Sequence, residues 1–243
     1  MQRNLRRIPR SPELLLGFTV QPVMFVLLFV YVFGGAIRTP GYDYVDFLMP
    51  GIITQSISFG GFVTAVGLSE DLRKGLIDRF RSLPMSRAAV LAGRTLSDVA
   101  TNGLSLVLLV AVGMIAGFDF KTGPLDVAGG FVLMLLFGYA FSWFFAWIGL
   151  LVSSPEAANS VGFIAIFPLT FASSAFVPTD SMPQALRTFA DVNPFTIVTN
   201  AMRALWVDAP AGNAIWGAFA WTLGLIAVFA PLAVARYRRV ASS

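Results

Sequence analysis

Six basic side chains give this 243-residue chain its main concentration of charge, and all six lie in the segment Glu70–Arg94. They are Arg73, Lys74, Arg79, Arg81, Arg87 and Arg94, out of seventeen basic residues in all. Long apolar stretches precede and follow this segment, so the charges are set between two hydrophobic parts of the chain. A compact charged segment in that position offers recognition chemistry, and it indicates a docking surface for a cytosolic partner.

Several residue types that common catalytic chemistry needs are missing from the sequence. It contains no histidine and no cysteine, which excludes an H-E-x-x-H zinc site, a serine–histidine pair and thiolate chemistry. Neither lysine, Lys74 or Lys121, follows a glycine as the phosphate-binding motif G-x-x-x-x-G-K-[ST] requires. Asp98 is the one acidic residue expected inside an apolar stretch, close to its edge, so a buried proton relay is not indicated. We therefore expect no catalytic residue, metal ligand or cofactor on this chain.

The charged segment has the apolar periodicity of a surface helix. Its apolar residues form one helical stripe, and charged residues fill most of the other positions. They are Leu72, Leu76, Ile77, Phe80 and Leu83. Pro84 ends this predicted helix because the residue before a proline is pushed out of α geometry, and Ser86 can cap a second helix from Arg87. The stripe fits either an anchor lying on lipid or a helix docked on a protein.

The elements that carry this segment are predicted to cross a membrane. Hydrophobic residues make up 56% and charged residues 12% of the chain, whereas soluble domains carry about 25% charged residues. A spanning helix needs about 20 apolar residues, and six stretches approach or exceed that length. They are residues 14–37, 47–69, 97–117, 127–152, 157–176 and 214–235. We predict an all-α polytopic membrane protein in which residues 1–243 form a single domain.

The distribution of basic residues predicts the orientation of these spans, because lysine and arginine accumulate in cytoplasmic loops. With six spans, the N-terminal segment, the charged segment and the C-terminal tail lie on one side. They carry thirteen basic residues, against four on the other side: Arg38, Lys121, Arg187 and Arg203. Both termini are therefore expected in the cytoplasm, and the chain in the cell membrane. The isoelectric point of about 9.8 does not indicate nucleic-acid binding, because the basic residues lie beside span ends.

A long connection, residues 177–213, separates the fifth and sixth predicted spans. Asn193-Pro194 divides its apolar series into two short helical stretches, and neither is long enough to cross a bilayer. Irregular backbone persists at membrane depth only where protein or water satisfies its polar groups. We expect a re-entrant pair of half-helices that closes the outer end, with Asn193, Pro194 and Arg203 as gate residues. A hairpin lying on the outer leaflet is the alternative.

Aromatic and amide side chains recur at helical spacing on two of the predicted spans. On the fifth span they are Asn159, Phe163, Phe167 and Phe171. On the second span they are Gln55, Phe59 and Phe62. Such faces suit a large amphipathic or apolar cargo, although aromatic stripes in spans also serve helix packing or face lipid.

Residues 68–98, LSEDLRKGLIDRFRSLPMSRAAVLAGRTLSD, resemble the signature of ABC exporter permeases of the second type, in the daunorubicin/doxorubicin-resistance branch. Further matching stretches are QPVMFVLLFVYVFGGAI (21–37), LMPGI (48–52) and FVPTDSMPQALRTFADVNPFTIVTNAMRAL (176–205). The resemblance thus covers nearly the whole chain. It departs at the N-terminus, where a short segment broken by two prolines stands in place of a longer interfacial helix.

The resemblance implies that two kinds of subunit share the work. In that family a coupling helix between spans 2 and 3 rests in a groove of a separate ATPase subunit. On this chain the contact falls on Ile77, Asp78, Arg79, Phe80, Arg81, Leu83, Pro84 and Arg87. Phe80 is the expected anchor, because a desolvated aromatic side chain binds better than an exposed charge. ATP and magnesium would bind to two copies of the ATPase subunit, so this chain itself is expected not to be an enzyme.

These expectations combine into one function. The chain is expected to be the permease subunit of an ATP-driven ABC exporter that moves a hydrophobic drug or lipid-like compound out of the cell by alternating access. A second copy or a paralogous permease would enclose the path with it, since spans 2 and 5 face the two-fold axis in similar exporters. Its other contacts would be with membrane lipid. Two alternatives stay open: a polysaccharide or glycolipid exporter of the same superfamily, and a membrane scaffold or lipid-modifying enzyme.

Overall fold

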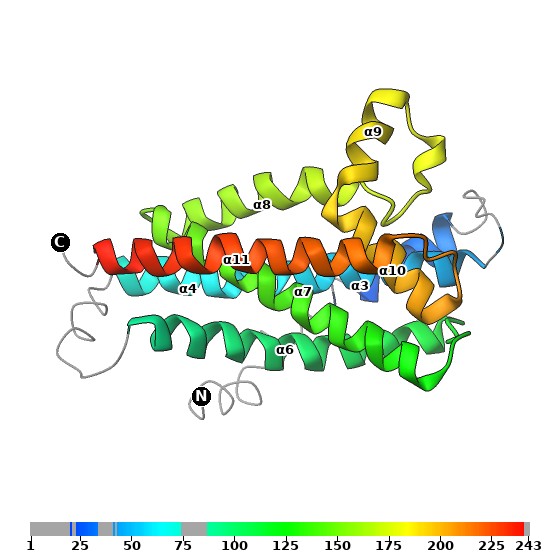
Figure 1. Cartoon of the computed structure of the whole chain (residues 1–243), viewed down its shortest axis with the longest axis horizontal. Helices are drawn as coiled ribbons and strands as arrows, with labels where there is room; N and C mark the ends of the chain where they lie inside the picture. The colour runs from blue at the N-terminus through cyan, green and yellow to red at the C-terminus, as the bar shows by residue number, and fades with distance from the viewer. Residues whose placement is uncertain (1–19, 21–22, 34–40, 42, 74–86, 241–243) are drawn as a thin grey trace.

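The computed structural model describes residues 20, 23–33, 41, 43–73 and 87–240, and within these ranges the chain is helical without strands (Figure 1). Side chains are described for the same residues except 87–90 and 240. The helices are η2 (Leu28–Phe33), α3 (Tyr44–Phe59), α4 (Phe62–Arg73), α6 (Arg87–Ile115), α7 (Pro124–Leu151), α8 (Pro155–Phe171), η3 (Thr179–Ser181), α9 (Gln184–Val192), α10 (Pro194–Val207) and α11 (Ala214–Val240). The predicted all-helical class is confirmed in this part of the chain.

Four helical stretches are long and apolar enough to cross a membrane, and they overlap the predicted second, third, fourth and sixth spans. They are Tyr44–Arg73, Leu91–Ile115, Pro124–Leu151 and Ala214–Arg239. The fifth predicted span corresponds to α8, which has 17 residues. Within the first predicted span, the described apolar helix is Val23–Val32. The number of six spans therefore stays a prediction.

The largest differences between predicted spans and helices lie at the start of α6, at the end of α8 and at the end of α11, which is Val240 and not 235. Helix α6 begins at Arg87, where a second helix was predicted, ten residues before the predicted span begins at 97. Arg87 and Arg94 separate these first turns from the apolar stretch. Helix α8 ends at Phe171 and not at 176, and Pro168 lies in its last turn. A proline inside a helix leaves one i→i−4 hydrogen bond unmade, which weakens the helix at that point.

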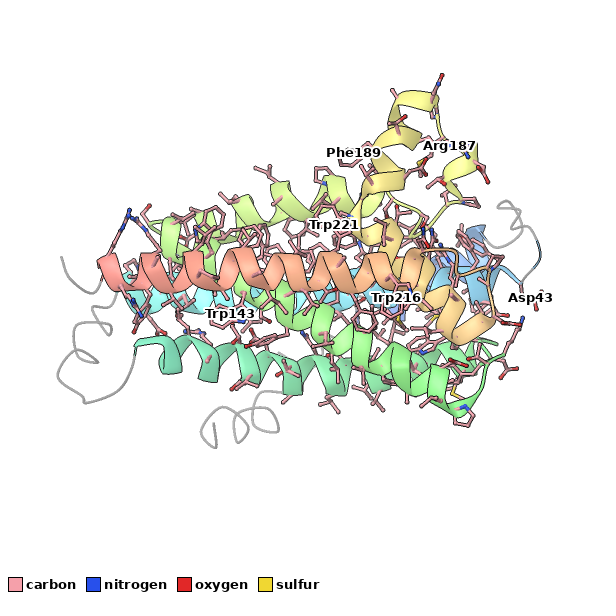
Figure 2. All side chains as sticks on the ribbon, viewed as in Figure 1. Asp43, Trp143, Arg187, Phe189, Trp216 and Trp221 are labelled. Carbon is pink, nitrogen blue, oxygen red and sulfur yellow. The ribbon has the colours of Figure 1, made fainter. Side chains whose placement is uncertain are left out.

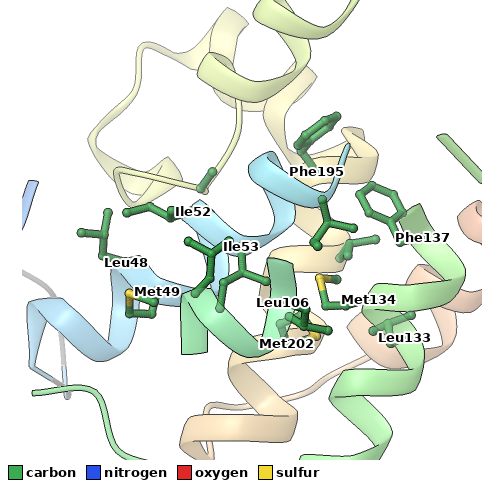
Figure 3. Packing of buried hydrophobic residues seen from close by; sticks show 14 of the residues in the cluster. Leu48, Met49, Ile52, Ile53, Leu106, Leu133, Met134, Phe137, Phe195 and Met202 are labelled. Carbon is green, nitrogen blue, oxygen red and sulfur yellow. The ribbon is translucent and has the colours of Figure 1, made fainter. Parts of the chain in front are cut away.

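Helix α7 is the central element of the bundle and packs against α11, α4 and α6. Figure 3 shows the middle of the core, where α3, α6, α7 and α10 bring together Ile53, Leu106, Phe137 and Phe195. All four of these side chains are buried. Lipid tails are as apolar as these side chains, so close van der Waals packing, and not exclusion of water, holds such helices together in a membrane.

The second predicted span is not one continuous helix, because Gly60 and Gly61 interrupt it between α3 and α4. Gly60 N donates to Ile57 O at 3.2 Å, a tight i→i−3 bond, and the regular ladder resumes when Ala65 N donates to Gly61 O at 3.2 Å. Paired small residues and side chains inserted beside the ladder are common causes of such breaks. The span therefore consists of two helical halves, α3 and α4, joined at Gly60 and Gly61.

The bundle has two distinct ends. At one end lie the end of α4, the start of α6, the turn between α7 and α8, and the C-terminal end of α11 (Figure 1). At the other end α9 projects from the bundle, and Figure 2 shows Arg187 and Phe189 on this projection and Asp43 nearby. At that end Lys121 forms an ion pair with Asp46, whose carboxylate raises the pKa of this lysine above its usual range. This pair fastens the loop between α6 and α7 to the start of α3.

Candidate functional site

The aromatic residues predicted to line a path lie against one another at the break in the second span. The rings of Phe59 and Phe62, one on each side of the break, stack with centroids 5.2 Å apart and planes at 6°. Phe163 of α8 meets both rings edge-on, and its centroid is 5.6 Å from each. The structure therefore brings three of the predicted path residues into one contact among α3, α4 and α8.

The row of rings continues along α8 toward the end where α9 lies. The centroid of Phe167 is 6.5 Å from that of Phe163, and the centroid of Phe171 is 4.3 Å from that of Phe167. These three side chains are 48%, 49% and 43% exposed. Ile164, on a neighbouring side of the same helix, is 73% exposed. Helix α8 thus presents an apolar flank to lipid, to cargo or to another chain.

Three aromatic residues outside the predicted set extend this row to the first predicted span. The centroid of Phe176 lies 5.4 Å from that of Phe171, and Phe29 stacks on Phe176 with centroids 4.8 Å apart and planes at 13°. Phe25, one helical turn before Phe29, stacks on it in turn at 5.9 Å. The helical spacing of Phe25 and Phe29 could have been recognised in the sequence. Their contact with Phe176 could not have been predicted, because it joins segments far apart in the sequence.

The two amides predicted on the path are not together. Gln55 lies one turn before Phe59 on α3 and is 9% exposed, so it is inside the bundle. Asn159 lies one turn before Phe163 on α8 and is exposed. Because α3 and α8 run in opposite directions, the amides lie on opposite sides of the Phe59–Phe163 contact.

Asn193, predicted as a gate residue, joins α9 and α10 to the end of α8. Its side-chain oxygen accepts a hydrogen bond from Phe195 N at 2.9 Å and so caps α10. Its amide nitrogen donates to Leu169 O at 2.7 Å and to Ala172 O at 2.8 Å. The last turn of a helix leaves carbonyls without intrahelical partners, and this amide satisfies two of them. Pro194 takes the first position of α10, where its missing N–H has no helical partner to lose.

Arg203, the third predicted gate residue, is buried, with 4% exposure. Its Nε and Nη2 donate to Phe47 O at 3.0 and 2.9 Å, and Nη2 also donates to Ser174 O at 2.7 Å. Nη1 donates to Asn200 Oδ1 at 2.9 Å. The guanidinium carbon lies 3.6 Å from the centre of the Phe47 ring, a cation–π contact. The side chain therefore ties α10 to the start of α3 and to the turn after α8.

The sequence indicated Arg203 but not the residues that accept its hydrogen bonds. Asn200 stands three positions earlier on the same helix face, a spacing that could have indicated it. Phe47 and Ser174 lie 156 and 29 positions from Arg203. Both contribute backbone carbonyls, which any residue type carries, and Ser174 also accepts a bond with its hydroxyl. No residue pattern could have predicted these two contacts.

The predicted ATPase contact falls outside the described residues for Ile77, Asp78, Arg79, Phe80, Arg81, Leu83 and Pro84. Arg87 is the first residue of α6, but its side chain also lies outside the described set. The elements on either side are described: α4 ends at Arg73, and α6 begins at Arg87. Across the described ranges, no group of three or more acidic residues could hold a metal ion.

Long apolar helices around a buried helix α7, with one open aromatic flank, define a polytopic α-helical membrane protein. Residues 1–206 match the ABC-2 type transporter family, and the chain belongs to that family. It is a permease of the ABC-2 type, in the branch of the drug-resistance permeases.

Three curated relatives show how far the similarity extends. The chain is 34% identical over 236 residues to the daunorubicin resistance ABC transporter permease protein DrrB1 of Streptomyces coeruleorubidus, covering 97% of this chain and 83% of that protein. It is 24% identical over 242 residues to the probable doxorubicin resistance ABC transporter permease protein DrrC of Mycobacterium tuberculosis, covering 99% and 87%. The probable multidrug ABC transporter permease YbhR of Escherichia coli O157:H7 is 22% identical over 205 residues, covering 82% and 54%.

Proposed function

We propose that this chain is the membrane permease of an ATP-driven exporter whose cargo is a flat, hydrophobic drug. The single observation that carries the cargo class is the aromatic row from Phe59 and Phe62 through Phe163, Phe167 and Phe171. Aromatic rings prefer stacked and edge-on partners, each worth about 0.5–1.5 kcal/mol beyond simple burial. A polycyclic aromatic compound fits such a row better than a sugar polymer, which needs many hydrogen-bonding groups. The names of the daunorubicin- and doxorubicin-resistance relatives support the same cargo class.

In the proposed arrangement the chain crosses the membrane six times, with the helix Val23–Val32 in the first span and α8 as the fifth. Both termini face the cytoplasm, in agreement with the excess of basic residues at that end. Residues 193–203 then belong to the outer end, where the bonds of Asn193 and Arg203 hold the re-entrant pair α9 and α10 against α8.

The proposed complex contains two permeases and two ATPase subunits. The segment around Phe80 docks on an ATPase subunit, which alone binds ATP and magnesium. The half-exposed rings of α8 face a second permease, so that the path lies between the two chains. ATP binding draws the ATPase subunits together, and hydrolysis resets them. The movement switches the path between inward and outward access.

The aromatic row is tested by removing two of its rings. The double variant Phe163→Ala, Phe167→Ala should lower ATP-dependent daunorubicin uptake into inverted membrane vesicles by about tenfold, the factor that loss of 1.4 kcal/mol of binding produces. The vesicles contain the permease co-expressed with its ATPase subunit, and uptake is followed by quenching of daunorubicin fluorescence.

Ile164→Ala is the matched control, because this side chain lies on the same helix, is more exposed and makes no ring contact in the described structure. It should keep uptake within a factor of about two of the unaltered chain. Equal uptake by the double variant and by the control would contradict the proposed role of the row.

A further inference from the structure

Helix α6 carries three polar residues, Arg94, Asp98 and Asn102, at intervals of four, so they lie on one face. All three meet α4 or the break that precedes it. Polar side chains within a spanning helix are costly unless they are satisfied by partners, and they usually mark function. We call this contact the polar seam. It consists of these three residues together with Gly60, Thr64, Gly67 and Asp71 on the facing span.

The seam begins beside the ends of α4 and α6. These ends flank the segment predicted to contact the ATPase subunit, residues 77–87, which we call the docking segment. Arg94 Nη1 lies 2.6 Å from Asp71 Oδ2, which makes an ion pair supported by a hydrogen bond. The guanidinium lies directly on Gly67, where the Cβ of any larger residue would overlap Nη2. A larger residue at position 67 would displace the guanidinium from this place. The arginine is therefore held by an acidic partner and by the surface of α4.

One turn further into the bundle, Thr64 Oγ1 donates to Asp98 Oδ2 at 2.6 Å. One turn beyond that, Asn102 is 3% exposed and lies against Gly60, where a Cβ would overlap its side-chain oxygen. In the described structure Asn102 Nδ2 is buried without a hydrogen-bond partner. An unpaired buried amide costs free energy, so its position needs an explanation. Its oxygen faces Gly60 at the break, whereas its nitrogen lies closest to Gly138 of α7.

The seam joins two features of the molecule that otherwise lie far apart. At one end it clamps together the two helices that emerge from the docking segment. At the other end it reaches the break, and Phe59 and Phe62 of the aromatic row stand on either side of that break. Beyond the break, α3 is fastened elsewhere, to Arg203 of α10 and to Lys121. Movement of the seam would therefore bend the span between the two rings.

We propose that the polar seam transmits movement of the docking segment to the aromatic row, with Gly60–Gly61 as the hinge. Arg94, Asp98 and Asn102 are positioning residues, because they act on the row through α4 and touch no cargo. Helix α4 and the first half of α6 move as one body, and the amide of Asn102 gains a backbone partner when the hinge bends. This proposal rests on the proposed export function.

The chain contains no cysteine, so a disulfide can replace one contact of the seam. In the double variant Thr64→Cys, Asp98→Cys the polar bond is lost, and ATP-dependent daunorubicin uptake should fall about tenfold under reducing conditions, within the range of measured coupling effects. Oxidation joins α4 to α6 covalently and should restore most of the uptake. A disulfide that forms and leaves uptake at the reduced level, or a reduced variant as active as the unaltered chain, would overturn the proposal.

A charge exchange tests the first contact of the seam in the same way. Asp71→Arg and Arg94→Asp should each lower uptake, and the two together should recover it. The order of these three variants by thermal midpoint of the purified complex should differ from their order by uptake. Ser97→Ala is the matched control, since this exposed hydroxyl bonds to Gly93 O within α6, off the seam. If each single exchange leaves uptake unchanged, the ion pair has no part in transmission.

A measurement that needs no cargo separates this proposal from the export function. Spin labels at Arg73→Cys on α4 and Leu96→Cys on α6 report the distance across the seam in the assembled complex. That distance should stay the same with and without trapped nucleotide, and it should broaden when Asp98→Ala is added. A distance that changes with nucleotide in the otherwise unaltered chain would show that the seam is not one body. Failure of daunorubicin uptake in the unaltered complex would instead contradict the export function alone.

Discussion

At the scale of single residues, Arg203 shows how a charge can be accommodated inside a membrane bundle. A guanidinium has five donors in a fixed planar fork, so one side chain can serve several carbonyls at once. Arg203 does this at the end of α8, where Phe47 O and Ser174 O both accept its hydrogen bonds. The turn after α8, the start of α3 and α10 therefore depend on one residue for their relative placement.

Replacing Arg203 with lysine should destabilise the protein although the charge is kept. An ammonium group cannot reach Phe47 O, Ser174 O and Asn200 together, and buried acceptors left without a donor cost about 1–3 kcal/mol. The thermal midpoint of the purified protein in detergent, followed by tryptophan fluorescence, should fall by several degrees.

Arg187→Lys provides the comparison for this change. Arg187 pairs with Asp180 at the surface, 2.6 Å apart with both side chains largely exposed, and such pairs are worth about 0–1 kcal/mol. Its midpoint should stay near that of the unaltered protein. Equal midpoints for both lysine variants would show that the guanidinium of Arg203 does not hold α3, α10 and the turn after α8 together.

At the scale of elements, small residues set how closely the helices approach. Gly51 of α3 faces the backbone of Ala175 in the turn after α8, where an added Cβ would overlap the carbonyl oxygen. Gly224 of α11 has open space around the same position. Both glycines are inside helices, so they differ in surroundings and not in backbone conformation.

The two glycines should respond to alanine with opposite signs. Gly51→Ala forces α3 and the turn apart, and overpacking of this kind costs about 1–3 kcal/mol. Gly224→Ala should leave the protein unchanged or stabilise it by up to about 1 kcal/mol, since alanine favours a helix over glycine. Thermal unfolding of the two variants side by side gives the answer. A midpoint for Gly51→Ala at or above that of Gly224→Ala would mean that the close approach is absent.

The helices of this chain could be predicted from apolar length, but the points where they meet could not. The stretches near 47–69, 127–152 and 214–235 each coincide with a helix to within a few residues, apart from the break in the first of them and the longer end of the last. The start of α6 at Arg87 agrees with the second helix predicted from that residue. The break at Gly60–Gly61 was missed, because its surroundings include Asn102 from another helix, which no local pattern reports.

At the scale of the whole molecule, we propose that the chain transmits force and leaves the chemistry to a partner. It lacks histidine and cysteine, and it has no phosphate-binding loop. Its polar contacts in the described ranges fasten helices to one another, as Asn193 and Asp98 do. We propose that this ABC-2 type permease takes its energy from a separate ATPase. The family resemblance was visible in the sequence, whereas the aromatic contact of Phe176, which follows α8, with Phe29 of the first predicted span was not.

The most direct test of energy supply by a partner is to measure ATP hydrolysis and daunorubicin uptake in proteoliposomes of defined composition. Liposomes with this chain alone should show neither activity. Liposomes with the chain and its ATPase subunit should show both, and magnesium removal should abolish both. ATP hydrolysis by the purified chain alone, or uptake that persists without the ATPase subunit, would contradict the claim that this protein moves its cargo with energy supplied by a partner.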